Sequence, residues 1–361
     1  MVKRDIPIIR IESHVFALAA SGDPEQLKQA LQHAVELEHA TMPPYLYAWF
    51  SLGRENGPVA KILKAVVREE MLHMTLAGNI LKAIGGSPRI AFKKFVPTYP
   101  GPLPGTVAQD LEVPLKPFSL QLVEQKFMRI EQPEHLLDFK TLSLELAEAE
   151  PAKTIGEFYR RIRKTFVEKG DSIIVDNTGA LQPNSERFSV DQRVRSAKEA
   201  IAAINLIVEQ GEGTETDPHF PDGDDQPDND KLAHYYRFAE LVKGRLKRNP
   251  EATPDTPPED RYFYNSSDRI AFDPSLVLPL PDNPVPGLYP AGSPAEAGNL
   301  TVNRLYTKVL KQLHEAFNGA PDQLEEAVGT MQDMRTAALQ LGELPIDGGL
   351  RAGPTFTYIE E

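Results

Sequence analysis

Residues 65–86 read AVVREEMLHMTLAGNILKAIGG, and they lie in the segment with the clearest helical pattern of the chain. Apolar side chains recur there at every third or fourth position, which predicts an amphipathic helix over residues 57–84. The pair Gly85-Gly86 then ends the helix, because glycine is the preferred residue just after a helix C-terminus. This helix is the first element on which the predicted fold is built.

Glu70 and His73 both fall on the apolar stripe of this helix. A spacing of three residues stacks two side chains on one helix face, so both can reach a single cation. A buried carboxylate is costly unless something pairs with it, and a metal ion would do so. The motif Glu-x-x-His is common by chance, however. Taken alone, it is better explained by a surface glutamate next to a hydrogen-bonded core histidine.

A second helix is predicted over residues 24–52, with Pro43-Pro44 either kinking it or starting a new segment. Its inward stripe includes Glu38, so a second helix also directs one carboxylate toward the interior. His39 points about 100° away from Glu38 on a helix, and we interpret it as packing or as an outer contact of the site.

Further candidates lie on three later helices. On the helix at 154–167, Glu157 shares its face with basic residues and is equally compatible with exposure and with a ligand role. On the helix at 190–211, Glu209 lies on a polar face that could point inward or outward. On the helix at 231–244, His234 lies on an apolar face, where a lone histidine is usually a core residue but could join a cluster of ligands.

Composition limits the function. The chain has 361 residues, a net charge of −13 and no cysteine, which excludes disulfides, thiolate chemistry and Fe–S clusters. An acidic protein is disfavoured as a binder of nucleic acid or of anionic membranes. The sequence has no signal-peptide pattern and no apolar run of about 18 residues, so we expect a soluble cytoplasmic protein.

Helical periods dominate, and alternating strand patterns are scarce, so the predicted fold class is mainly α with a helical bundle at its centre. Proline-rich stretches at 86–117 and 245–298 are expected to form long loops that shape a substrate pocket. We expect a bundle with the metal site over residues 20–245 and a C-terminal helical extension packed on it over residues 246–361.

The order of several segments resembles a known family. LQHAVELEHATMPPYLYAWFSL at 31–52 and the glutamate–histidine helix at 65–86 are its most specific parts, and IEQPE, TIGEFYRRI, IVEQGEGT, AHYYRFAEL and AGPTFTY follow in order. This pattern resembles the ferritin-like family that includes iminophenylpyruvate dimer synthases. The resemblance extends from about residue 27 to the C-terminus.

The resemblance implies a ferritin-like four-helix bundle with a carboxylate-rich site, in which iron, as a dinuclear centre, is expected and manganese is the alternative. The implied metal ligands are Glu38, Glu70, His73, Glu157, Glu209 and His234. Glu212 stands three residues after Glu209, where the family pattern has histidine, and His234 could replace that missing ligand.

Three functions follow as hypotheses. The first is an oxidoreductase that acts with O₂ or peroxide on a small amino-acid-derived or other organic substrate, as the resemblance implies. The second is a non-catalytic metal-binding or storage protein, and the third is a manganese catalase-like enzyme that dismutates peroxide. The expected partner is a small-molecule substrate, with a homo-oligomer as a further possibility and neither nucleic acid nor membrane.

Overall fold

The computed structural model describes residues 13–53, 57–104, 111–133, 136–137, 139, 155–219 and 231–360. Their α-helices are α1 (Ser13–Ala20), α2 (Pro24–Ser51), α3 (Gly57–Ala83), α4 (Leu120–Leu122), α5 (Met128–Ile130), α6 (Ile155–Lys169), α7 (Ala197–Glu212), α8 (His234–Lys243), α9 (Pro294–Phe317) and α10 (Gln323–Leu341). Two short strands, β1 (Arg245–Arg248) and β2 (Tyr262–Asn265), pair antiparallel. The prediction of a mainly α fold is confirmed.

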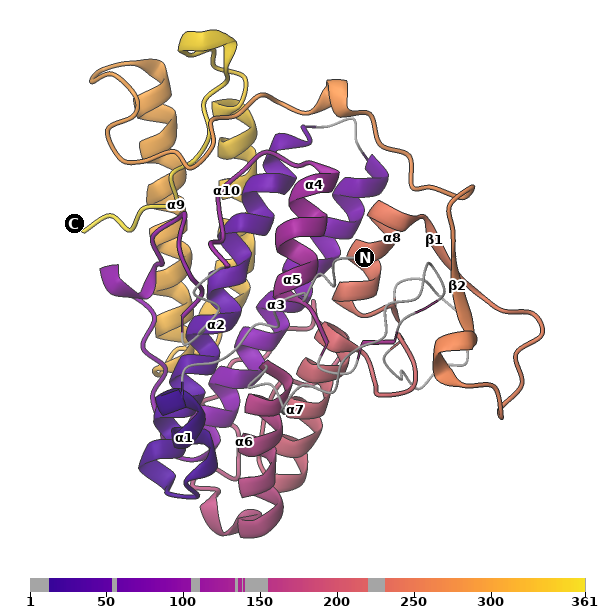
Figure 1. The fold of residues 1–361 in the computed structure, drawn as a ribbon. Coiled ribbons are helices and arrows are strands. Elements are labelled where there is room, and N and C mark those ends of the chain that lie inside the picture. Colours follow the sequence, from indigo (N-terminus) through magenta and orange to yellow (C-terminus); the bar gives the residue numbers. More distant parts are fainter. Residues whose placement is uncertain are drawn as a thin grey trace.

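Helices α2 and α3 form the central pair and run side by side (Figure 1). Helix α2 begins at Pro24, directly after Asp23, whose carboxylate accepts hydrogen bonds from two backbone N–H groups of the first turn. Pro43 and Pro44 lie inside α2, which continues through them to Ser51. The alternative of a new segment at these prolines is therefore wrong.

Helices α6 and α7 pack on each other, and α7 also contacts α3, which completes the four-helix bundle (Figure 1). Helix α8 lies at the upper end of α7 and contacts α3 as well. A π-helical turn, η2 (Val123–Phe127), separates α4 from α5 and packs against α8. The chain thus brings α8 and the end of α5 to the middle of the bundle.

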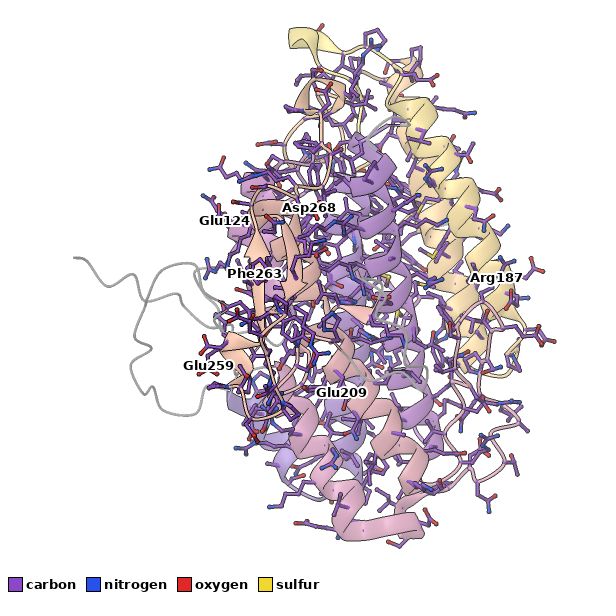
Figure 2. The ribbon with its side chains drawn as sticks, turned by 90° about the vertical axis from the view of Figure 1, so that its right-hand side faces the viewer. Glu124, Arg187, Glu209, Glu259, Phe263 and Asp268 are labelled. Carbon is purple, nitrogen blue, oxygen red and sulfur yellow. The ribbon has the colours of Figure 1, made fainter. Side chains whose placement is uncertain are left out.

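The C-terminal helices α9 and α10 form a hairpin that packs on the bundle, α9 against α3 and α10 against α2. Where α9 packs on α3, the ring of Phe317 lies so close to Gly78 that a Cβ atom added at residue 78 would be 2.4 Å from a ring carbon. Arg187, labelled in Figure 2, reaches α10 and pairs with Glu325 at 2.8 Å. The division of the chain at residues 245 and 246 stays a prediction.

Among the described residues, none of the helices is both long enough and apolar enough to cross a bilayer.

Candidate metal centre

Three side chains from the two central helices meet in the interior of the bundle. Glu38 comes from α2, and Glu70 and His73 come from α3. All three are buried, and one ligand atom from each lies within 4.8 Å of the others. Thr41, one turn after Glu38, donates to Oε2 of Glu70 at 2.7 Å. The i, i+3 spacing therefore brings the side chains of Glu70 and His73 into one group of possible ligands, as the sequence predicts.

A second group of three shares Glu70 with the first. It consists of Glu70, Glu131 and His234, again with ligand atoms within 4.8 Å of one another. Nδ1 of His234, the first residue of α8, lies 3.0 Å from Oε1 of Glu70 and 3.4 Å from Oε2 of Glu131. Glu131 is the residue at the C-terminal end of α5. Glu70 therefore belongs to both groups, and its carboxylate could be shared if metal were bound at each.

Two buried phenols fix the outer carboxylates. Tyr159 of α6 donates from its hydroxyl to Oε1 of Glu38 at 2.5 Å. Tyr45 of α2 donates in the same way to Oε1 of Glu131. Burial and the adjacent carboxylates hold the pKa of both phenols well above the usual value, so both remain hydrogen-bond donors. Each of the two glutamates is left with its Oε2 atom free to face the centre.

The two imidazoles are oriented by acceptors on their far sides. Nε2 of His73 lies 2.9 Å from Oε1 of Gln210 on α7, and Nε2 of His234 lies 2.8 Å from Oε2 of Glu69. Arg237 pairs with the same Glu69 oxygen at 3.0 Å. In the neutral tautomer that donates from Nε2, the Nδ1 lone pair of each ring points to the carboxylates. Such outer partners orient metal-binding histidines in proteins.

Charge at the centre is unbalanced. Although burial alone would raise the pKa of Glu69, Arg237 and His234 lower it to about 2, so this carboxylate is charged and paired. Glu38, Glu70 and Glu131 have no Lys or Arg partner among the described residues. Burial, followed by the charge of Glu131, raises the pKa of Glu70 to about 7. Among the described residues, the only positive charge beside these three carboxylates is that of His73 and His234, although burial alone would lower the pKa of both, which the carboxylates raise.

The orphaned Nδ1 atom of His234 tests whether a metal would fit. This nitrogen makes no hydrogen bond within the described part of the chain, although a carboxylate oxygen lies 3.0 Å away. Burial would lower the pKa of His234, but Glu131 and the other carboxylates hold it well above the usual value. Oxygen and imidazole nitrogen atoms are the ligands that iron and manganese take. The residues present therefore fit a metal centre, and a cation would take the place of the protons.

The structure brings together four of the six residues predicted as ligands and leaves two outside. Glu157 forms ion pairs with Arg161 at 2.9 Å and Arg160 at 3.3 Å, because the three residues follow one another at i, i+3 and i+4 on α6. Glu209 lies near the end of α7, where Figure 2 labels it, and lines a separate cavity. Among the described residues, Glu131 joins the second candidate group, and neither Glu157 nor Glu209 belongs to either group.

His39 lies apart from this centre. Its Nε2 atom is 2.8 Å from the hydroxyl of Tyr306, and its ring packs 4.5 Å from that of Phe95. Burial lowers the pKa of His39 to about 3, so the ring is neutral. Of its two predicted roles, the structure therefore supports packing.

Two neighbouring spaces lie in this part of the bundle, and the inner one contains the centre. The inner one, about 40 Å³, is lined by the candidate ligands together with Thr41 and Tyr159. The outer one, about 270 Å³, is lined by α6, α7 and the residues after α7. Val208 and Glu212 line both spaces. The predicted loops at 86–117 and 245–298 contribute no described residue to either space, so the expectation that they shape the pocket has no support.

Comparison with known proteins identifies the family of the chain. The sequence model of the family named Ferritin-like matches residues 31–243. Dichlorochromopyrrolate synthase of Lentzea aerocolonigenes is 26% identical over an alignment covering 99% of this chain and 38% of that enzyme. The 2-imino-3-(indol-3-yl)propanoate dimerase of Chromobacterium violaceum is 24% identical over 64% of this chain and 24% of that protein. The chain thus spans well under half the length of the curated relatives it matches.

A solved structure shares the fold. The ferritin-like protein of Caulobacter vibrioides superposes with a TM-score of 0.54 and 21% identity, over 92% of this chain and 97% of that one. The family match covers more than half of the residues and includes the helices that carry Glu38, Glu70, His73 and His234. The chain belongs to the Ferritin-like family.

Proposed function

We propose that the protein is a non-heme oxidoreductase with a dinuclear metal centre. Iron is the expected metal and manganese the alternative. The observation that carries the proposal is the position of Glu70 between two carboxylate–imidazole groups, Glu38 with His73 and Glu131 with His234. A shared carboxylate is the arrangement that holds two cations close together, and ferritin-like bundles build such sites from inward-facing glutamates and histidines.

When bound, the metal ions supply the electron-transfer steps and the affinity for O₂ or peroxide. The chain itself orients the ligands, through Tyr159, Tyr45 and Thr41, and keeps bulk water away. The inner space of about 40 Å³ holds ions and molecules the size of O₂ or water, but no organic substrate. We infer that the organic substrate binds in the outer cavity, which shares Val208 and Glu212 with the inner space.

The names of the relatives support an amino-acid-derived substrate. One relative is a dimerase of 2-imino-3-(indol-3-yl)propanoate, and the other is a synthase of dichlorochromopyrrolate. Joining two imino acids by a carbon–carbon bond removes two electrons and two protons. One O₂ molecule accepts these as H₂O₂, so the overall reaction balances. We propose a reaction of this oxidative type for the present chain, on a small amino-acid-derived or other organic substrate.

The test measures O₂ uptake by the protein loaded with Fe²⁺ or Mn²⁺. The imine is generated in the cuvette from L-tryptophan by an amino-acid oxidase, and that enzyme's own O₂ uptake is subtracted. Substrate-dependent uptake by the wild type, with a coupled product in the mass spectrum, is expected, and Glu70→Ala should abolish both. Release of O₂ from H₂O₂ without organic substrate would instead support the catalase-like hypothesis, and a 24-subunit particle without turnover would support storage.

A further inference from the structure

We propose that the outer cavity is a binding site for a ligand that carries both a carboxylate and a cationic nitrogen, with Arg163 binding the carboxylate. An α-amino acid or its iminium form is such a ligand. The inference rests on the proposed function and adds to it the place of the organic substrate and the residues that recognise it.

The size and position of the cavity support this role. Its volume of about 270 Å³ is close to the lower end of the range for small-molecule pockets, roughly 300 Å³. It shares Val208 and Glu212 with the inner space that the candidate ligands surround. The outer cavity is thus a neighbour of the inner space, with Val208 and Glu212 lining both.

One wall of the cavity is basic and lies on α6. Arg160 is held by its ion pair with Glu157 at 3.3 Å. Arg163 makes no hydrogen bond or ion pair with any described residue, and its Nε atom is buried. A buried guanidinium N–H without an acceptor is costly, and its planar fork fits a carboxylate with two parallel hydrogen bonds. Arg163 is therefore the cation on this wall that calls for an anionic ligand.

The facing wall is acidic. Glu209 and Glu212, at the end of α7, and Glu215, just beyond it, all line the cavity. Glu212 is held in place by the backbone N–H of Gly156, which donates to its Oε1 atom at 2.9 Å. Burial raises the pKa of Glu209, and it raises that of Glu212 to about 7. In their ionised form these carboxylates repel a simple anion and attract an ammonium or iminium group. Ile204 and Val208, on the same helix, also line the cavity and offer an apolar surface for a side chain.

This arrangement also gives Glu209 a role that differs from the predicted one. The carboxylate lines the outer cavity and has no ion-pair partner among the described residues. It is therefore available to a positively charged ligand nitrogen.

The test is calorimetric titration of the full chain as purified, under argon, with three probes of equal shape. L-phenylalanine has both charges, 3-phenylpropanoate lacks the nitrogen, and L-phenylalaninamide lacks the carboxylate. The wild type should bind L-phenylalanine at least tenfold more tightly than either other probe, as expected when a charge-assisted pair is lost. Arg163→Gln should weaken L-phenylalanine about tenfold and leave the amide unchanged.

Lys164→Gln is the matched control, since it removes one positive charge from the next residue of α6, which is exposed and paired with Glu168 at 3.6 Å. It should bind all three probes as the wild type does. Glu209→Gln should weaken L-phenylalanine but not 3-phenylpropanoate. Equal binding of L-phenylalanine by Arg163→Gln and wild type, each with a native melting curve, would overturn the proposal, as would equal affinity of the wild type for all three probes.

Glu70→Ala separates this inference from the proposed function. Loss of metal with retained L-phenylalanine binding is the expected result. A wild type that takes up no metal yet still selects the zwitterion would refute the dinuclear oxidoreductase and leave the ligand site standing. A wild type that binds metal but none of the probes would refute the ligand site and leave the dinuclear oxidoreductase standing.

Discussion

Nδ1 of His234 lies 3.0 Å from Oε1 of Glu70, and Nδ1 of His73 lies 4.0 Å from the same oxygen. The two imidazoles come from helices far apart in the sequence, and their rings stack with centroids 5.5 Å apart. One carboxylate thus faces two histidines, each held from behind by its own acceptor. This relationship is what makes the bundle interior a candidate for two cations.

The phenol groups beside the centre should set metal affinity. Tyr159→Phe removes the hydroxyl that donates to Glu38, and Tyr45→Phe removes the one that donates to Glu131. Each variant should bind Fe²⁺ or Mn²⁺ roughly 10- to 100-fold more weakly in a chelator competition, since outer partners orient the ligands. Tyr306→Phe, which loses a hydrogen bond to His39 elsewhere, is the control. Wild-type affinity in both site variants would show that the phenols do not position the carboxylates.

Arg237 should matter for stability in the absence of metal. Arg237→Met leaves the buried Glu69 carboxylate without its guanidinium, which costs about 3–5 kcal/mol for a buried ion pair broken on one side. The double variant Glu69→Gln with Arg237→Met should recover part of that loss, because no carboxylate then remains uncompensated. Denaturant unfolding of the metal-free protein measures both. A double variant less stable than the single one would contradict this account.

The stability of the folded chain should depend on pH through Asp217, which lies in the segment after α7. Its carboxylate accepts hydrogen bonds from two groups of His219, the backbone N–H at 3.0 Å and the ring Nδ1 at 2.9 Å. The hydroxyl of Tyr262 donates a third at 3.0 Å. Burial opposes these contacts, but they hold the pKa of Asp217 below its usual value. The unfolded chain then takes up the proton first, so the stabilisation is complete above about pH 4 and is lost as the pH falls through the folded-state pKa.

Asp217→Asn should accordingly lower the melting temperature at pH 7, and the difference from the wild type should shrink at pH 3. Asp333→Asn, on the exposed face of α10, is the control and should change little at either pH. A difference between Asp217→Asn and the wild type that is the same at both values of pH would show that the charge of Asp217 does not contribute.

Gly156 should control the position of Glu212 between the two spaces. A Cβ atom at Gly156 would lie 2.5 Å from Oε2 of Glu212, so the flexible end of that side chain would have to move. Gly156→Ala should be about as stable as the wild type. The higher helix propensity of alanine, up to about 1 kcal/mol, offsets the weaker hydrogen bond from the residue-156 N–H to Glu212. L-phenylalanine binding should weaken severalfold by calorimetry. Unchanged binding would show that the position of Glu212 does not affect binding of the ligand.

The sequence predicts the central half of the candidate site because that half lies on regular helices. Glu38, Glu70 and His73 follow the apolar stripes of α2 and α3, where a period of 3.6 residues tells inside from outside. His234 also lies on an apolar face, but one histidine alone does not distinguish a ligand from a core residue. Only the packing of α8 against α3 in the folded chain places His234 beside Glu70.

Glu131 could not be found in this way. It ends a short helix that follows the π-helical turn η2, where the helical period is interrupted, and Pro133 stops the chain from continuing the pattern. The available signal was the family-like segment IEQPE, in which Glu131 is the first acidic residue. For Glu157 the charge pattern favoured an exposed face with Arg160 and Arg161, and the structure has that arrangement. The family pattern pointed the other way.

The most direct test of the central claim is the metal content per chain after anaerobic loading and removal of excess metal. About two ions per wild-type chain are expected by elemental analysis, about one each in Glu38→Gln and Glu131→Gln, and almost none in Glu70→Ala, while Glu157→Gln should match the wild type. Metal content that is unchanged in Glu70→Ala, or a wild type that retains no metal, would contradict a centre built around a shared Glu70 carboxylate.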